Sequence, residues 1–254
     1  MYKVADIVKT LEELFPLENA MSYDNPGLLT GSRDAEVKGI LLTLDCTSRA
    51  ISVALEKGCN LIIAHHPLIF GGIDNVCADN VTGKILSSLI KNDIALYACH
   101  TQLDCTDEFG NLELAKVLDV EGTKLEGASI GVVYDLFAPV SLWEYANFVS
   151  DKLNCSGVST ISSKDKKVKR VFVQGGAFDE ENLDVIVSSG VDLVISGEIK
   201  HHLMVYLEEC GIAAFAAGHN ATERIYLPKL KNVLDEKFSS MPIFVDFGNE
   251  TKLL

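Results

Sequence analysis

The sequence lacks the motifs of several common enzyme classes. It contains no C-x-x-C pair among its seven cysteines, no G-x-x-x-x-G-K-[ST] loop, and no G-x-G-x-x-G motif after its first predicted strand. An odd number of cysteines without regular spacing argues against a disulfide framework, so we expect thiols in apolar segments, such as Cys59 and Cys99, to be buried. The missing glycine-rich motifs argue against a P-loop nucleotidase and against a Rossmann-type dinucleotide-binding protein.

Positive charge is also scarce. The chain of 254 residues has 22 lysine and arginine residues against 36 aspartate and glutamate residues, a formal net charge of −14. This balance argues against general nucleic-acid binding and against a membrane surface as a partner, although bound divalent ions would add positive charge locally. No apolar run approaches the roughly 20 residues that span a bilayer. Acidic residues interrupt the amino terminus early, which is not typical of a signal peptide, and we expect a cytoplasmic protein.

Apolar residues make up 48% of the sequence, enough for a substantial core, and they follow an alternating pattern. Residues 3–15 have helical apolar spacing and end at Pro16. The turn-rich segment 24–31 is expected to be a loop, although its two polar residues, Asp24 and Asn25, could also line a site. Short apolar runs then alternate with helical segments. The expected strands are 39–44, 59–64, 94–99, 128–137, 170–174, 191–196 and 212–217, and the expected helices are 47–57, 84–92, 112–118, 141–153, 180–189 and 203–210.

Two halves of the chain show the same order of elements. Each runs strand, helix, strand with a histidine pair, helix and strand, and then has a histidine followed four residues later by a carboxylate. We interpret this match as a pseudo-repeat. The sequence therefore predicts an α/β fold of two similar lobes, about 1–126 and 127–254, each a largely parallel sheet flanked by helices. Ligands of open α/β sheets bind outside the carboxyl ends of the strands, so we expect a common metal site between the lobes.

The central motif is Ala64-His65-His66-Pro67, at the carboxyl end of a predicted buried strand. Within a regular strand, adjacent side chains point to opposite faces, so two neighbouring histidines could hardly bind one ion together. Pro67 has no N–H and biases His66 toward an extended backbone, which predicts that the strand ends here. The two imidazoles can then turn toward different acceptors. The alternative is one buried and one surface histidine without a metal.

Five residues at three strand ends have the chemistry of a metal site. They are His65, His66, Asp104, His219 and Glu223. Imidazole and carboxylate ligands together favour Zn²⁺, Mn²⁺, Fe²⁺, Co²⁺ or Ni²⁺ over Ca²⁺. Such a set is too large for one catalytic zinc with an open position, whereas two divalent ions per chain, bridged by a carboxylate and a water, would use it fully. The alternative is a set of unrelated polar groups at loop ends.

Three further histidines could take part. His100 lies four residues before Asp104 and is a candidate proton shuttle, or a group that supports a metal ligand from behind. It could equally cap a strand end. His201 and His202 form the second histidine pair, and a structural role fits them as well as a functional one.

Six segments, in order along nearly the whole chain, carry a family resemblance. They are DNPGLLTG at 24–31, LDCT at 44–47, AHHPLIF at 64–70, HTQLD at 100–104, SGEIKHH at 196–202 and GHNATE at 218–223. Together they resemble the Nif-three-like family of GTP cyclohydrolase 1 type 2 homologues, in its short form without an inserted domain. The resemblance implies that the five residues above form a two-metal site. It also implies a toroidal homohexamer whose sites face an internal cavity.

The expected function is that of a dinuclear, divalent-metal-dependent hydrolase acting on a nucleotide or a related phosphate-containing small molecule. If the protein opens GTP, as the family name implies, an activated water would attack C8 of the purine, with His100 as the candidate proton shuttle. The alternative is a metal-binding regulatory or scaffold protein that uses the same fold without catalysis. Catalysis requires a site open to substrate, whereas a structural metal site is closed by protein ligands.

Overall fold

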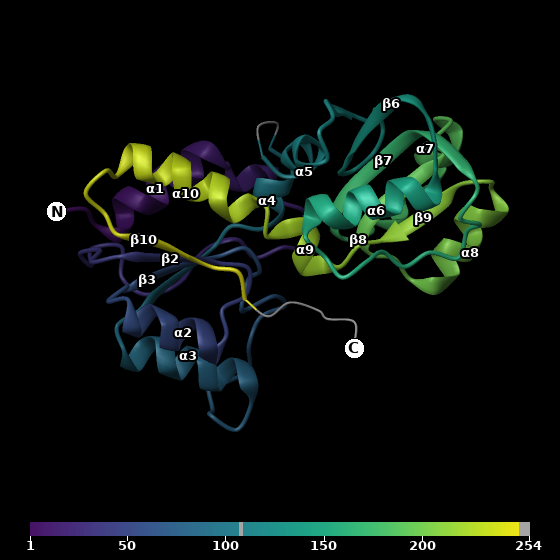
Figure 1. Cartoon of the computed structure of the whole chain (residues 1–254). Helices are drawn as coiled ribbons and strands as arrows, with labels where there is room; N and C mark the ends of the chain where they lie inside the picture. The colour runs from purple at the N-terminus through teal and green to yellow at the C-terminus, as the bar shows by residue number, and fades with distance from the viewer. Residues whose placement is uncertain (107–108, 249–254) are drawn as a thin grey trace. The chain divides into compact units, whose positions relative to one another are not determined.

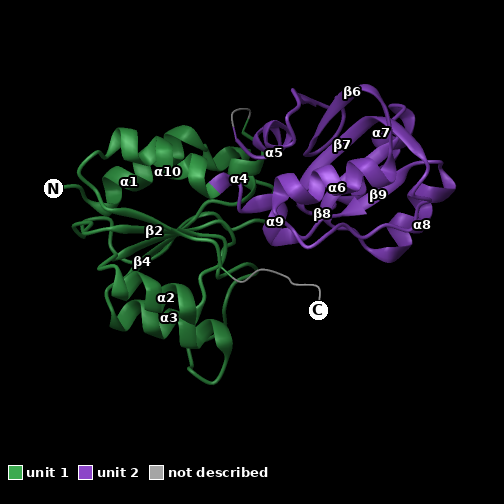
Figure 2. Cartoon of the chain, viewed as in Figure 1, with its two compact units in different colours: residues 1–106, 227–248 green, residues 107–226, 249–254 purple. Residues whose placement is uncertain are grey.

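A computed structural model describes residues 1–106 and 109–248 of the chain (Figure 1). The chain divides into two compact units, coloured separately in Figure 2. Unit 1 contains Met1–Thr106 and Leu227–Gly248, and the described part of unit 2 is 109–226. The expected lobes are about 1–126 and 127–254. Residues 227–248 belong to unit 1 because the carboxyl-terminal segment pairs with the first sheet instead of the second.

Unit 1 is built on a five-stranded sheet whose central strands are wholly buried. In spatial order the strands are β1 (Gly27–Thr30), β4 (Ala95–Ala98), β3 (Leu61–Ala64), β2 (Ile40–Thr43) and β10 (Ile243–Asp246). The last four are mutually parallel and β1 is antiparallel to β4. Every residue of β2, β3 and β4 is buried, which explains their continuous apolar runs, because helices cover both faces of this sheet.

The helices of unit 1 lie on both faces of its sheet (Figure 1). On one face are α1 (Val4–Leu14) and α10 (Tyr226–Lys237), and on the other are α2 (Ser48–Glu56) and α3 (Val81–Lys91). Thr47 caps the amino end of α2, because its hydroxyl accepts a hydrogen bond from the Ala50 N–H at 3.1 Å. A short helix η1 (Leu17–Asn19) follows α1, and a short helix α4 (Thr101–Asp104) follows β4.

One segment of unit 1 differs from its prediction. The turn-rich stretch 24–31 is predicted to be a loop, but Gly27–Thr30 forms the edge strand β1. Its ladder partner is β4, almost 70 residues later in the sequence, so no local pattern marks it as a strand. Gly31 is required at its end: φ is +100°, and a Cβ there would lie 2.5 Å from the Cβ of Ala95.

Unit 2 contains a second five-stranded sheet, which is mixed. In spatial order its strands are β5 (Thr123–Lys124), β6 (Val132–Ser141), β7 (Lys167–Ala177), β8 (Leu193–Glu198) and β9 (Ala213–Ala216). β7, β8 and β9 are parallel, as expected, whereas β5 and β7 both pair antiparallel with β6. The prediction of a largely parallel sheet thus holds for the repeated part of unit 2 but not for its first two strands.

The helices of unit 2 also form two layers. They are α5 (Asn111–Val117), α6 (Leu142–Leu153), η2 (Glu180–Asn182), α7 (Leu183–Ser188), α8 (His201–Glu209) and α9 (His219–Glu223). Alternate strand residues divide between the layers: Val171 and Val173 belong to the core under α5 and α6, while Phe172 belongs to the core under α7 and α8. A capping box begins α6, because the Ser141 N–H donates to Glu144 Oε2 at 3.1 Å and the Glu144 N–H donates to the Ser141 hydroxyl at 3.3 Å.

The two units share a topological core. In each, three consecutive parallel strands lie side by side, β2-β3-β4 in unit 1 and β7-β8-β9 in unit 2, and a short helix follows the third strand. These short helices are α4, which ends at Asp104, and α9, which begins at His219 and ends at Glu223. The repeated topology therefore carries the same kind of residues to the same end of each sheet.

No helix among residues 1–106 and 109–248 has the length and apolar character needed to cross a membrane.

Candidate metal-binding site

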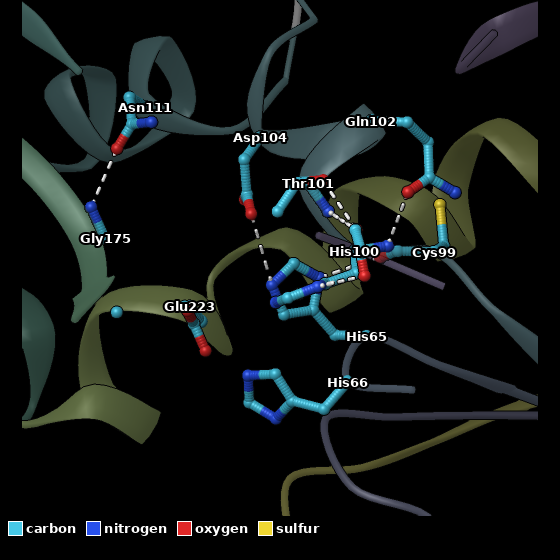
Figure 3. A network of polar contacts seen from close by, with 12 residues as sticks. His65, His66, Cys99, His100, Thr101, Gln102, Asp104, Asn111, Gly175 and Glu223 are labelled. Carbon is cyan, nitrogen blue, oxygen red and sulfur yellow. Dashed lines mark hydrogen bonds and ion pairs between the residues drawn. The ribbon is translucent and has the colours of Figure 1, made fainter. Parts of the chain in front are cut away.

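Three imidazoles gather at the carboxyl ends of neighbouring strands in unit 1. His65 and His66 follow β3, and His100 follows β4 (Figure 3). One ligand nitrogen of each lies within 4.8 Å of those of the other two, and the ring centroids are 5.0–5.5 Å apart. β3 ends at Ala64, as Pro67 predicts, and this ending allows two adjacent histidines to reach one cluster. His65 is buried and His66 is partly exposed, yet both rings belong to the cluster.

Each imidazole is oriented through its Nδ1 atom. His65 Nδ1 lies 2.8 Å from the Cys99 carbonyl oxygen, His66 Nδ1 lies 2.9 Å from Asp45 Oδ1, and His100 Nδ1 lies 2.9 Å from Asp24 Oδ1. A carbonyl oxygen or an ionised carboxylate can only accept, so in each case Nδ1 carries the proton and donates. In a neutral imidazole the lone pair is then on Nε2, and this is the arrangement in which histidine binds a metal ion.

Asp24 supports this cluster from within the protein. Its Oδ2 accepts hydrogen bonds from the Thr101 N–H at 3.1 Å and the Thr101 hydroxyl at 2.5 Å. Burial alone would raise the pKa of the Asp24 carboxyl, but the hydrogen bonds from His100 and Thr101 outweigh it and hold that pKa at about 2. Asp24 is therefore ionised at neutral pH and fixes the orientation of His100. In the sequence this aspartate opens the turn-rich segment DNPGLLTG, one of the six family segments.

A carboxylate completes the group in unit 1. Asp104 is the last residue of α4, and its Oδ2 lies 3.6 Å from His65 Nε2 (Figure 3). The structure thus brings three of the five predicted ligands, His65, His66 and Asp104, into one region of unit 1. It also adds His100, which the sequence pattern leaves outside the predicted ligand set, to the same cluster of imidazoles.

The other two predicted ligands form a pair in unit 2. His219 and Glu223 lie four residues apart on α9, which puts them on one helix face, and His219 Nε2 is 3.1 Å from Glu223 Oε2. Glu223 is buried. On the other side of the ring, Glu198 at the end of β8 has its Oε1 3.5 Å from His219 Nδ1. Glu198 lies in the quoted segment SGEIKHH, and its carboxylate faces the Nδ1 side of His219, as that of Asp45 faces the Nδ1 side of His66.

Two glycines allow α9 to lie against the strand ends. Gly176 has φ of +65°, and a Cβ there would lie 2.1 Å from Glu223 Oε1. A Cβ on Gly197 would lie 2.7 Å from the Cα of His219. The Gly176 N–H also donates to the Thr222 hydroxyl at 3.1 Å. The GG dipeptide at the end of β7 is the available sequence signal for this close approach.

A cavity of about 240 Å³ adjoins the His219 side of unit 2. Its walls include small residues at the ends of β8 and β9 together with Glu198, Asn220 and Arg224. The Arg224 guanidinium is held in place, because its Nη2 donates to the Leu153 and Asn154 carbonyl oxygens at 3.0 and 2.8 Å. The predicted ligand His219 therefore borders a space large enough for a small molecule or several waters.

The histidine pair of the second half does not belong to either group. His201 and His202 are the first residues of α8, and both are exposed. In the first half the pair directly follows strand β3, whereas in the second half it begins helix α8. This difference accounts for the absence of His201 and His202 from the candidate ligand clusters of the described residues.

The three buried cysteines are poor candidates for nucleophiles. All seven lie among the described residues as reduced thiols, and Cys59 and Cys99 are buried as predicted. Burial raises the pKa of Cys46 to about 12 and that of Cys59 to about 11, and it raises the pKa of Cys99 well above its usual value. These three thiols stay protonated at neutral pH, and the thiolate is the nucleophilic form.

One serine lies in a G-x-S-x-G sequence, at 127–131, which is the pattern of a nucleophile elbow. The structure does not support that role. Ser129 precedes strand β6 instead of turning from a strand into a helix. Its hydroxyl donates to Asp179 Oδ2 at 2.6 Å, and its oxygen also lies 3.0 Å from Asn182 Oδ1. These contacts indicate a structural serine that joins the segment before β6 to η2.

The fold and these residues define an α/β protein with a candidate metal-binding site. Residues 2–251 match the Duf34/NIF3 (NGG1p interacting factor 3) family. The chain is 30% identical to a Clostridium acetobutylicum protein named GTP cyclohydrolase 1 type 2 homolog, over 97% of this chain and 96% of the relative. A Clostridium perfringens protein of the same name is 29% identical, over 96% of this chain and 95% of the relative. The chain therefore belongs to the Duf34/NIF3 family, as the six sequence segments predict.

Solved structures agree with this assignment. A Staphylococcus aureus hypothetical protein superposes with a TM-score of 0.91 and 27% identity, covering 99% of both chains. Reduced HcgD from Methanocaldococcus jannaschii superposes with a TM-score of 0.83 and 27% identity, covering 96% of this chain and 97% of that one. The predicted α/β architecture of two helix-flanked sheets is thus confirmed.

Proposed function

We propose that this protein is a divalent-metal-dependent hydrolase with two ions per chain. The proposed ligands are His65, His66, Asp104, His219 and Glu223. The observation that carries the proposal is the imidazole cluster of unit 1, in which every Nδ1 is held by an oxygen acceptor. Histidines that bind a metal ion almost always donate their other ring N–H to an oxygen acceptor, and all three imidazoles of this cluster do so.

The donor set fits the proposed ions. Three imidazole nitrogens and two carboxylates match the preferences of Zn²⁺, Mn²⁺, Fe²⁺, Co²⁺ or Ni²⁺. A pair of such ions would supply Lewis-acid polarisation of a substrate oxygen and activation of water. Asp45 and Glu198 lie behind His66 and His219, and a carboxylate in that position raises the basicity of the ligating imidazole.

His100 is the proposed acid–base group. Its ring belongs to the imidazole cluster, and ionised Asp24 holds its Nδ1 proton. His100 Nε2 is then the atom that would accept a proton from the attacking water and later return one to the leaving group. The carboxylate behind the ring stabilises the imidazolium that forms in between, as it does in other carboxylate–histidine pairs.

The proposed substrate is a nucleotide or a related phosphate-containing small molecule, a class suggested by the name that the relatives carry. The test is a panel of nucleotides and phosphoesters assayed with metal-stripped protein and with the same protein reloaded with each of the five metals. We expect turnover of at least one compound only after reloading. If metals bind fully and no compound is hydrolysed, the metal-binding scaffold becomes the better account.

We also propose, from the family resemblance, that six copies assemble into a toroidal homohexamer with its sites facing an internal cavity. Enclosure of the sites would restrict their ligands to small molecules, in keeping with the proposed substrate class. Light scattering at micromolar protein is expected to give a mass close to six times 27.6 kDa. A mass equal to that of one chain would contradict this assembly.

A further inference from the structure

Two exposed aromatic rings extend from the imidazole cluster in unit 1. Phe70 is 50% exposed and Tyr23 is 62% exposed. Their ring centroids are 6.0 Å apart, with the planes tilted by 45°. The Phe70 centroid is also 6.1 Å from that of His100, at an interplanar angle of 70°. We call Tyr23 and Phe70 the aromatic shelf. Its Phe70 ring lies next to the ring of the proposed acid–base histidine, and its Tyr23 ring lies next to that of Phe70.

Hydrogen bonds fix the backbone on both sides of the shelf. The Asn25 side-chain amide donates to the Ile69 carbonyl oxygen at 2.6 Å, which joins the segment after Tyr23 to the residue before Phe70. The Asn25 N–H donates to Asp24 Oδ1 at 2.7 Å, and the same carboxylate binds His100. Both rings are therefore attached to the network that orients the cluster. Exposed aromatic side chains on such a preorganised segment lose little conformational freedom when a ligand covers them.

We propose that the aromatic shelf binds a planar aromatic or heteroaromatic ring of the small molecule whose reacting group lies at the imidazole cluster. This inference rests on the proposed function, because the proposed metal ions define where the reacting group lies. Aromatic rings favour other rings in offset-stacked or edge-to-face geometries with centroids about 4.5–7 Å apart. Phenyl and phenol side chains carry no charge at neutral pH, so the shelf selects ligands by ring shape and apolar area.

Two hydroxamates test the shelf without knowledge of the substrate. Acetohydroxamate and 2-naphthohydroxamate carry the same metal-binding group and differ in whether a planar ring is attached. Their dissociation constants are measured by calorimetry with the zinc-loaded full-length protein. We expect 2-naphthohydroxamate to bind roughly three- to ten-fold more tightly, the fold-change that an aromatic pair typically supplies. Phe70→Ala should remove most of this preference and leave the affinity for acetohydroxamate unchanged.

Two variants serve as controls. Phe137→Ala removes a fully exposed phenylalanine of unit 2 and should keep the wild-type preference. Phe70→Tyr preserves the ring and should keep it as well. Unchanged acetohydroxamate binding in Phe70→Ala also shows that this variant is folded around an intact metal site.

Three results would overturn the inference. If the naphthyl preference persists in both Phe70→Ala and Tyr23→Ala while acetohydroxamate binds normally, the shelf has no ligand role, but the metal site stands. If acetohydroxamate does not bind zinc-loaded wild-type protein, the proposed function fails first and the shelf loses its basis. If light scattering shows that Phe70→Ala lowers the mass of the assembly, the rings form a contact between copies of the chain.

Discussion

Replacement of His100 by asparagine is expected to slow turnover by roughly 10²–10⁴-fold, the usual contribution of a positioned acid–base group. Most of the bound metal should remain, because the five proposed ligands are intact. Asparagine keeps a hydrogen-bonding group of similar reach but cannot exchange a proton near neutral pH. The pH dependence of turnover should therefore lose one limb. Both quantities are measured on the same preparation, by elemental analysis and by initial rates over a range of pH.

His202→Asn is the matched control for this experiment. His202 is exposed on α8, so the same chemical change there should alter neither metal content nor rate. Asp24→Asn should give a weaker form of the His100 effect, since it removes the carboxylate that orients the imidazole. A collapse of metal content in His100→Asn would instead make His100 a ligand, which its place in the imidazole cluster permits. An unchanged rate would leave it without a chemical role.

Much of the fold is predictable because its strands carry strong local signals. β2, β3 and β4 are short apolar runs between turn residues, and every one of their residues is buried. The positions of the histidines are predictable too. A residue directly after a buried parallel strand lies at the carboxyl end of the sheet, where ligands bind. This rule alone assigns His65, His66 and His219 to strand ends.

The unpredicted parts depend on pairing between distant segments. β1 becomes a strand only because β4 offers it an antiparallel partner, and β10 returns to pair with β2 from the far end of the chain. No local periodicity records such pairings. The roles of the supporting groups escape prediction for a related reason: Asp24, Asp45 and Glu198 lie in the quoted family segments, but only the fold shows that their carboxylates lie behind the imidazoles.

The second large effect concerns metal loading. His65→Ala and Glu223→Ala each remove one proposed ligand, from unit 1 and unit 2 respectively, and each is expected to lower the metal content sharply. Binding should also weaken below about pH 6, because a free imidazole has a pKa of roughly 6.5 and a protonated ring cannot bind a cation.

Elemental analysis of the purified chain tests the central claim most directly. Protein purified without chelators is expected to contain close to two divalent ions per chain, and the double variant His65→Ala, Glu223→Ala is expected to contain almost none. The variant His201→Ala, His202→Ala, which removes an exposed histidine pair, should match the wild type. Full metal content in the double variant lacking His65 and Glu223 would contradict the proposed site.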